Sequence, residues 1–562
     1  MLGRSPNGWE WTRAVQCVTD FLYGAVTERL VAQNIDISEL GGLALPIKPM
    51  ARHRPFPGLT ELFNTKTKDR LQSYQLIDAL IMDLHRSISD DAHSALAIDL
   101  ARSVFNFQHI HLLQGPTWVN SEQFLLTYTT SLTGGSIIDF AAEPFGFRNL
   151  PAALTGPWLL EPLAGPNTAC LRPQQANNFA PEQRRFILLW YNNHSQRSDV
   201  CLYILDLEQH TLYALPTYNF WIYQDLLHIF HLALDMPLWI DPQARSNHFR
   251  SLPKADRLNH LPAPCPIHFG HYLQNNLAHL SRLEDLGILA LMDQIFRPKT
   301  FDYFLPEEEK LFVAEATRPK LKVVDSDREA IQLSKANHQA LIVSKSSSFG
   351  SNLSANFRRS VLTPSTKPEV ALWVCVGVRG GTRMCLNLVD FVITLAAELN
   401  RVANRPIHLV IDGMSRSALN GRDTTAGLST SHEQAIANDI IAKASSVQSV
   451  SASSIVGLTT FEQLSQICRC SLAVSGFGTQ YFKYMYLCHV PTIVHGIKEP
   501  DDYLNVGITP VHLFLGQDSV ASVEKTNDDM RHHYNLKVAL STARSVLFAE
   551  QTGALTALAT PA

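Results

Sequence analysis

The sequence predicts an α/β protein whose last third forms a doubly wound parallel sheet. After residue 368, short and almost wholly apolar runs alternate with helical segments. Such runs are typical of parallel strands that are covered on both faces. The loops between them are short, as expected for strands and helices that alternate along the chain. The length of 562 residues exceeds what one core supports, so several domains are expected.

The first two thirds of the chain divide into three regions that differ in composition and in the spacing of apolar residues. Residues 1–110 are expected to be mainly helical, because apolar positions in 67–88 recur with a helical period. Residues 111–330 are expected to form a mixed α/β domain, in which the apolar runs 185–193 and 201–207 predict neighbouring strands. Residues 331–368 are rich in Ser, Asn, Thr and Pro, which indicates a linker.

Residues 369–562 contain the clearest pattern and are expected to be a Rossmann-like domain that ends in C-terminal helices. Thr459 and Glu462 have the spacing of a capping box, which marks a helix start. Ligands of such sheets bind outside the carboxyl ends of the strands. The predicted strands are ALWVCVGV (371–378), PIHLVIDG (406–413), CSLAVSG (470–476), VPTIVHG (490–496) and VHLFLG (511–516), and the predicted helices are 387–401, 432–444, 459–469 and 480–488.

The first strand-to-helix loop of interest, GVRGGTRMCLN (377–387), combines three glycines with Arg379 and Arg383. Glycine lets the backbone approach a ligand closely, a helix N-terminus offers unpaired N–H groups, and arginine binds phosphate with two parallel hydrogen bonds. This combination predicts a phosphate-binding loop. The alternative is a flexible loop with two solvated arginines.

The second loop, VSGFGTQYFKYMYL, places Ser475, Gly476, Gly478, Thr479 and Gln480 between a buried strand and a helix. Small residues and hydroxyls there form a concave set of donors suited to a diphosphate or a sugar. The spacing matches neither the dinucleotide G-x-G-x-x-G pattern nor a Walker loop. The alternative is that the small residues serve packing alone.

Three further residues are candidates for the site. Asp412 ends a predicted strand, where acids contact a ribose in dinucleotide folds, although it would equally serve to cap the following loop. His271 and Asn275 are one helical turn apart in HFGHYLQNN. A neutral imidazole there would accept the proton of an acceptor hydroxyl, with Asn275 orienting it or binding a sugar. The alternative is a polar helix start. No metal-ligand spacing occurs among these residues.

Three segments together resemble a known family. TTFEQLSQICRCSLAVSGFGTQYFKYMYLCHVPTIVHG (459–496) is similar to the donor-binding end of GT-B glycosyltransferases. RGGTRMCLN (379–387) and PIHFGHYLQNNLAHLSRLEDLG (266–287) are similar to motifs of the family-61 glycosyltransferases. In that family a carboxylate stands four residues after the motif His, where this chain has Asn275. The resemblance implies a GT-B fold with two Rossmann-like domains and sugar transfer without a metal.

The expected function is therefore that of a glycosyltransferase, with a nucleotide sugar as donor, no separate cofactor, and a glycan, protein or lipid-linked acceptor. The net charge of −4 gives no indication of a nucleic-acid partner. Nine unpatterned cysteines, no signal peptide and no transmembrane segment favour a cytoplasmic protein, for which peripheral membrane contact stays open. The alternatives are a non-catalytic Rossmann-like scaffold that binds a partner in polysaccharide or surface assembly, and a sugar-nucleotide epimerase.

Overall fold

The computed structural model describes several stretches of the chain, which fall into two units. The helices expected in residues 1–110 lie almost entirely outside the residues that the structure describes. The described residues are 107–114, 119–142, 145–174, 185–192, 199–215, 242–263, 269–299, 303–345, 361, 370–380, 384–418, 421, 430–476, 479–495, 512–515, 520–526 and 529–534.

The first sheet has eight strands and is mainly antiparallel. The two strands predicted as neighbours, β7 and β8, pair antiparallel along their apolar runs. Helix α5 (Ser121–Gly134) packs on this sheet, with Phe124 and Tyr128 against the buried Trp190. The strand order is β1-β9-β8-β7-β6-β4-β3, with β2 beside β8, and the bounds are β1 (His109–Leu112), β2 (Val119–Asn120), β3 (Ser136–Asp139), β4 (Pro157–Pro162), β6 (Thr168–Pro173), β7 (Phe186–Asn192), β8 (Asp199–Asp206) and β9 (Thr211–Leu215).

The second sheet has five strands in the order β12-β11-β10-β13-β5. Its four strands that follow one another in the sequence thus have the order 3-2-1-4, as in half of a Rossmann fold. The pairs β11–β12 and β13–β5 are parallel. The bounds are β5 (Gly165–Pro166), β10 (Leu258–Pro262), β11 (Gln294–Pro298), β12 (Leu321–Val324) and β13 (Ala340–Ser344).

Helices separate the last four of these strands, β10 to β13, along the chain. After β10 come α8 (Phe269–His271), the π-helix η5 (Tyr272–Leu277) and α9 (Ala278–Asp285). Helix α11 (Asp327–Ala336) precedes β13. Residues 331–344, expected to belong to a linker, therefore complete α11 and form β13. The Ser- and Asn-rich composition that indicated a linker begins only at Ser344.

The third sheet confirms the doubly wound prediction. Its six strands have the order β16-β15-β14-β17-β18-β19, which is the order 3-2-1-4-5-6 of a Rossmann fold, and every pair is parallel. The bounds are β14 (Leu372–Gly377), β15 (Ile407–Asp412), β16 (Val450–Ser454), β17 (Leu472–Gly476), β18 (Thr492–His495) and β19 (His512–Leu515).

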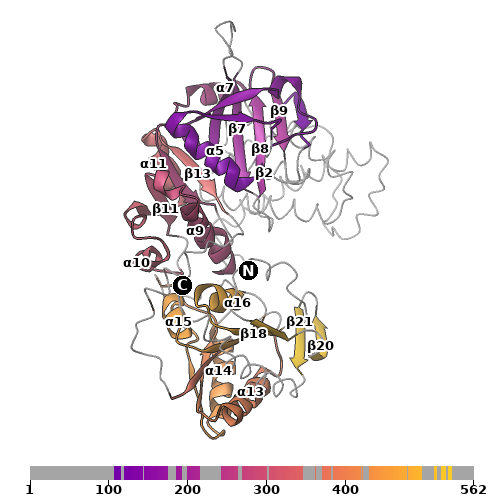
Figure 1. The fold of residues 1–562 in the computed structure, drawn as a ribbon, viewed down its shortest axis with the longest axis vertical. Coiled ribbons are helices and arrows are strands. Elements are labelled where there is room, and N and C mark those ends of the chain that lie inside the picture. Colours follow the sequence, from indigo (N-terminus) through magenta and orange to yellow (C-terminus); the bar gives the residue numbers. More distant parts are fainter. Residues whose placement is uncertain are drawn as a thin grey trace, which may run out of the picture. The chain divides into compact units, whose positions relative to one another are not determined.

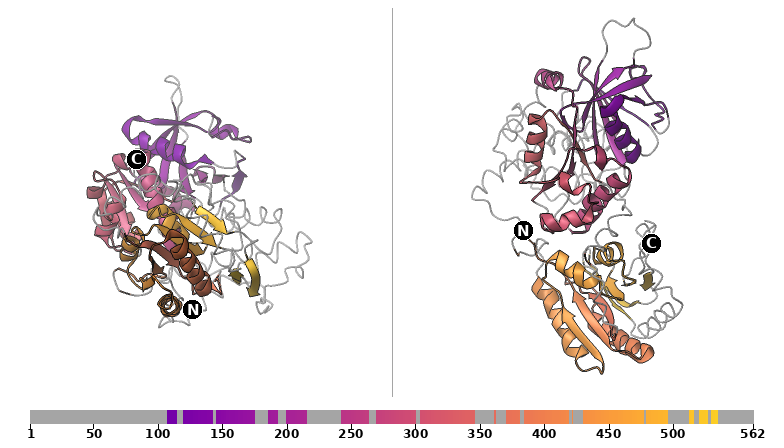
Figure 2. Two further views of the ribbon diagram at one scale, coloured as in Figure 1. Left: turned by 60° about the horizontal axis from the view of Figure 1, so that its bottom comes forward. Right: turned by 60° about the vertical axis from the view of Figure 1, so that its left-hand side comes forward.

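Two helix layers cover this third sheet. Helices α13 (Leu388–Ala403) and α14 (Thr430–Ala444) share a core cluster with Val374 and Val376 on one face. Helix α15 (Thr460–Ile467), α16 (Thr479–Phe482) and the π-helix η9 (Lys483–Leu487) share another with Cys375 on the opposite face. Figure 1 labels these helices around β18, and the right-hand view of Figure 2 shows the orange helices running beside the strands. The predicted capping box of Thr459 and Glu462 is present at the start of α15.

Two elements of this region differ from the prediction. Strand β16 was not expected because its sequence, VSASS, is polar. It is an edge strand with Ser451 and Ser453 exposed, so only one face needs apolar side chains. Part of the tail expected to be helical forms the antiparallel hairpin β20 (Val520–Thr526) and β21 (Asp529–Tyr534). No helix among the described residues is long and apolar enough to cross a membrane.

Candidate donor site at the carboxyl edge of the six-stranded sheet

The strand order fixes where a ligand of this sheet would bind. The order reverses between β14 and β17, which are parallel neighbours with Val376 opposite Val474. Both strands therefore end at the same edge, Gly377 closing β14 and Gly476 closing β17. Open α/β sheets bind ligands in the crevice outside such a reversal point. The two glycine-bearing turns singled out in the sequence both begin at this point.

The two turns contact each other directly through Gln480. Its side-chain Nε2 donates a hydrogen bond of 2.8 Å to the carbonyl oxygen of Val378. A methyl group on Gly377 would lie only 3.0 Å from Gln480 Oε1 and 2.8 Å from the hydroxyl of Tyr484. Gly377 is therefore a place of close approach, where the backbone of one turn touches side chains of the other.

The structure places the predicted residues of these turns in different settings. Arg379 follows β14 and is half-buried, and Thr479 and Gln480 form the first turn of α16. The hydroxyl of Ser475 is fully buried and donates to the carbonyl oxygen of Gly476 at 2.9 Å, so it is directed into the protein rather than toward a ligand. Arg383 and Gly478 lie outside the described residues.

Asp412 ends β15, as predicted, but its partners give it a different role. The ammonium of Lys483 donates to its two carboxylate oxygens at 2.7 and 2.9 Å, and the hydroxyl of Tyr484 donates to Oδ2 at 2.6 Å. Asp412 has no exposed surface, and Lys483 is 4% exposed. The prediction that Asp412 contacts a ribose is therefore replaced by a structural role. A carboxylate that is buried and fully engaged holds the surrounding segments together instead of offering an oxygen to a sugar.

The network around Asp412 joins three elements at the edge of the sheet. Lys483 also donates to Gln463 Oε1 at 2.7 Å, which ties η9 to α15. Gln463 Nε2 donates in turn to the carbonyl oxygen of Ile455 at 3.0 Å. Burial, together with the charge of Asp412, raises the pKa of Tyr484 well above its usual value, so this phenol stays protonated as a donor. These contacts fix the backbone on which the second turn is built.

Glu433, in the first turn of α14, is a second buried acid that the sequence analysis missed. Its Oε1 accepts a hydrogen bond of 3.2 Å from the backbone N–H of Gly380, and its Oε2 accepts one from the N–H of Met414. The segments that follow β14 and β15 are thereby tied to one carboxylate. A signal for it was present in the sequence, since an acid in the first turn of a helix lies beside the ends of the preceding strands in this fold.

His271 and Asn275, the candidate catalytic pair, lie in the second sheet's first helical connection. His271 is the last residue of α8 and Asn275 lies within η5, whereas the directions of their side chains are not described. Their neighbour Tyr272 is firmly anchored. Its hydroxyl donates to Glu309 Oε1 at 2.5 Å and accepts from Arg297 Nη2 at 2.9 Å. The π-helix η5 at this point agrees with a functional role, because π-helical turns within α-helices are frequent at functional sites.

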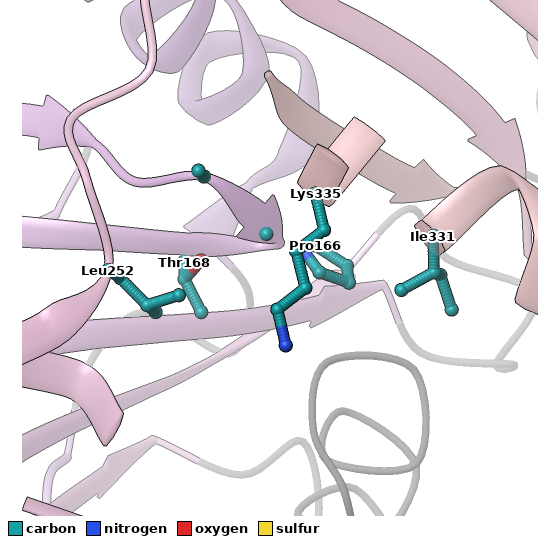
Figure 3. Close-up of a pocket in the computed structure, with 7 residues that line it drawn as sticks. Pro166, Thr168, Leu252, Ile331 and Lys335 are labelled. Carbon is teal, nitrogen blue, oxygen red and sulfur yellow. The ribbon is translucent and has the colours of Figure 1, made fainter. Parts of the chain in front are cut away.

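A small cavity elsewhere in the described residues has fewer polar side chains that could bind a ligand. It lies beside β5 and is lined by Pro166, Thr168, Leu252, Ile331 and Lys335, together with Ala164 and Gly165 (Figure 3). Ligand sites combine an apolar cavity with several convergent polar groups. Here the polar side chains are limited to one hydroxyl and one ammonium, so we assign no function to it. No group of three or more His, Cys, Asp or Glu side chains suited to a metal occurs in the described part of the chain.

Replacing Gly377 with alanine is expected to lower the free energy of unfolding by about 1–3 kcal/mol, the usual range for overpacking a core. The added methyl group would displace the Tyr484 hydroxyl, 2.8 Å away, from its bond to Asp412. Urea denaturation would measure the change. Gly134→Ala is the control, because nothing lies within 4 Å of its added carbon. Equal effects of the two substitutions would contradict the close approach of the turns.

No protein-family model matches the chain, and no curated protein matches it. Among solved structures it is similar to the glycosyl transferase family 9 protein from Veillonella parvula DSM 2008. That match has 9% identity and a TM-score of 0.28, and covers 53% of this chain and 97% of the other. TarM matches with 12% identity and a TM-score of 0.21, over 88% of this chain and 85% of the other. Likeness at this level carries no argument, so the α/β assignment rests on the strand orders of the chain itself.

Proposed function

We propose that the chain is a glycosyltransferase that uses a nucleotide sugar and binds the donor's diphosphate between the turns that follow β14 and β17. The observation that carries this proposal is the strand order 3-2-1-4-5-6, with both glycine-bearing turns at the point of reversal. The hydrogen bond from Gln480 to Val378 supports it, because it shows that the two turns meet. The resemblance of residues 459–496 to GT-B donor sites agrees with this position.

In the proposed mechanism, the protein stabilises a departing nucleoside diphosphate. The acceptor hydroxyl forms a bond to the anomeric carbon of the sugar while the bond from that carbon to the diphosphate breaks. Arg379, Arg383 and the first backbone N–H groups of α16 would supply positive charge to the leaving group, without a metal. His271 would accept the hydroxyl proton, with Asn275 orienting it or the sugar. Preorganised charge of this kind is the main source of rate enhancement in many enzymes.

The first test is binding of nucleoside diphosphates. Thermal unfolding of the whole chain is measured with UDP, GDP, CDP and ADP and with the corresponding nucleotide sugars. A ligand at 100 times its Kd stabilises the folded state by about 2.7 kcal/mol. We expect one nucleotide to raise the Tm. If all of them leave the Tm unchanged at millimolar concentration, the proposal is wrong.

Arg383→Ala and Arg379→Ala are each expected to weaken binding of that nucleotide by about 1–3 kcal/mol, the cost of losing a hydrogen bond to a charged group. Titration calorimetry measures the Kd of each variant. Arg401→Ala is the matched control, because this arginine lies in the last turn of α13, away from the carboxyl edge, and pairs with Glu398. Unchanged affinity in Arg383→Ala would remove that residue from the site.

The rival interpretation is a non-catalytic scaffold that binds a partner in polysaccharide or surface assembly. A scaffold and an enzyme can both bind nucleotide, so the distinguishing measurement is turnover. A glycosyltransferase releases free nucleoside diphosphate when an acceptor glycan, protein or lipid-linked sugar is added, and a scaffold does not. We also propose a cytoplasmic location, where nucleotide sugars are available to such an enzyme.

A further inference from the structure

Val378–Gly380, the start of the turn after β14, is held from three directions. The N–H of Val378 donates to the carbonyl oxygen of Asp412 at 2.8 Å, and its own carbonyl accepts from Gln480 at 2.8 Å. Two residues later, the N–H of Gly380 donates to Glu433 at 3.2 Å. The first two contacts fix the end of the strand. The contact to Glu433 fixes the part of the turn that carries Arg379.

Glu433 is suited to this task because its carboxylate accepts from two loops at once. Oε1 binds the N–H of Gly380 and Oε2 binds the N–H of Met414, two residues beyond the end of β15. Backbone amides that point into a common space form binding sites for anions in proteins. In this chain a carboxylate of the protein itself occupies such a pair of amides. The Glu433 side chain is 6% exposed.

The surroundings of Glu433 leave little room for another arrangement. A methyl group on Gly413 would lie 2.5 Å from Glu433 Oε2, and one on Gly380 would lie 3.1 Å from Glu433 Cγ. Both glycines are thus places where the backbone approaches this side chain closely. Burial raises the pKa of Glu433, as does the charge of Asp412, whereas the two amide hydrogen bonds and Lys483 lower it. The amides and Lys483 thus favour the ionised carboxylate against the cost of burial.

We propose that Glu433 is the positioning residue of the turn after β14, to which the proposed function assigns the donor's diphosphate. Its carboxylate fills a backbone anion site formed by the N–H groups of Gly380 and Met414. This inference rests on the proposed function for its purpose, but its geometry stands without a nucleotide. Glu433 does not contact the donor. It holds the backbone directly after Arg379, at Gly380, so that the diphosphate meets a turn that is already ordered.

Amide hydrogen exchange of the whole chain without nucleotide tests the geometry. In Glu433→Gln, one amide faces an NH₂ group instead of an oxygen, and in Glu433→Ala both lose their acceptor. We expect exchange at Gly380 and Met414 to become at least about tenfold faster in Glu433→Ala and less so in Glu433→Gln. Glu398→Gln is the matched control, since Glu398 is also buried but pairs with Arg401 on α13. Unchanged exchange at both amides would overturn the proposal.

Chemical rescue gives a readout that a merely structural role would not change. In Glu433→Ala the vacated site is expected to bind formate, which restores slow exchange at Gly380 and Met414, whereas chloride at equal ionic strength does not. Failure of formate to slow either amide overturns the anion site. If Glu433→Ala does not fold, the amide exchange rates of Gly380 and Met414 in Glu433→Gln test the proposal instead.

Nucleotide binding then links the geometry to function. With the nucleoside diphosphate that stabilises the wild type, Glu433→Gln is expected to bind about tenfold more weakly, and formate is expected to restore part of the affinity of Glu433→Ala. If the wild type binds no nucleotide, the proposed function fails while the exchange measurements still stand. If the wild type binds and both variants bind equally well, the positioning role fails and the proposed function survives.

Discussion

Replacing Lys483 with methionine is expected to lower the free energy of unfolding by about 3–5 kcal/mol, which is the cost of breaking a buried ion pair from one side. The carboxylate of Asp412 has no exposed surface and would lose two of its hydrogen bonds, leaving the Tyr484 hydroxyl as its side-chain donor among the described residues. Gln463 would also lose its contact to the ammonium. Urea denaturation followed by circular dichroism measures the change.

The matched control is Lys443→Met. Lys443 forms an ion pair of 2.6 Å with Asp390 on α13, but both side chains are more than half exposed. Exposed pairs contribute about 0–1 kcal/mol, so this variant should be nearly as stable as the wild type. In the double variant Lys483→Met with Asp412→Asn, part of the lost stability should return, because no uncompensated charge is left. A small and equal effect of both lysine variants would contradict a buried network.

The second large effect is expected for Glu309→Leu, again about 3–5 kcal/mol. Glu309, in α10 (Pro306–Glu309), is the anionic partner of Arg297, and both side chains are almost fully buried. A guanidinium cannot lose its proton in a protein, so Arg297 would stay charged and buried without the carboxylate of Glu309. Tyr272 would lose the acceptor of its hydroxyl at the same time. Thermal unfolding of the variant measures the loss.

Glu307→Leu is the control for this prediction. Glu307 lies two residues away in the same helix and pairs with Lys310, but its side chain is 80% exposed. A surface substitution of this kind stays within about 0.5 kcal/mol. Since Tyr272 begins the π-turn that carries Asn275, Glu309→Leu should also speed amide exchange in residues 272–277. A variant that is destabilised without faster exchange in residues 272–277 would show that the contacts of Tyr272 with Glu309 and Arg297 do not hold η5 in place.

The sequence predicted the third sheet well because its signal is local. The run LWVCVG is apolar throughout and IHLVID is mostly apolar, which is what burial on both faces requires. The edge strand β16 lacked this signal because one of its faces is exposed. The strand order of the eight-stranded sheet was beyond reach for another reason. Its strand order depends on a pairing across a long stretch of chain, since β1 pairs in parallel with β9 over 100 residues later.

The site was predicted less completely, because its contacts join distant residues. Asp412 was found at the end of a strand, but its partner Lys483 lies 71 residues further on. Lys483 and Tyr484 both reach Asp412 from η9, and no period of apolar residues distinguishes a π-turn from an α-helix. A clue was available, since Lys483 is the only charged residue in QYFKYMYLC. A single charge within an otherwise apolar helix points to a buried partner.

The strand order also determines when the two glycine-bearing turns come together during synthesis. Strands β14 and β17 are neighbours in space, but β15, α14, β16 and α15 all lie between them in the chain. A ribosome makes β14 and its turn first and must translate through residue 476 before β17 is complete. Until then β14 lacks a partner on that side, and its open edge is exposed to other chains in the crowded cell.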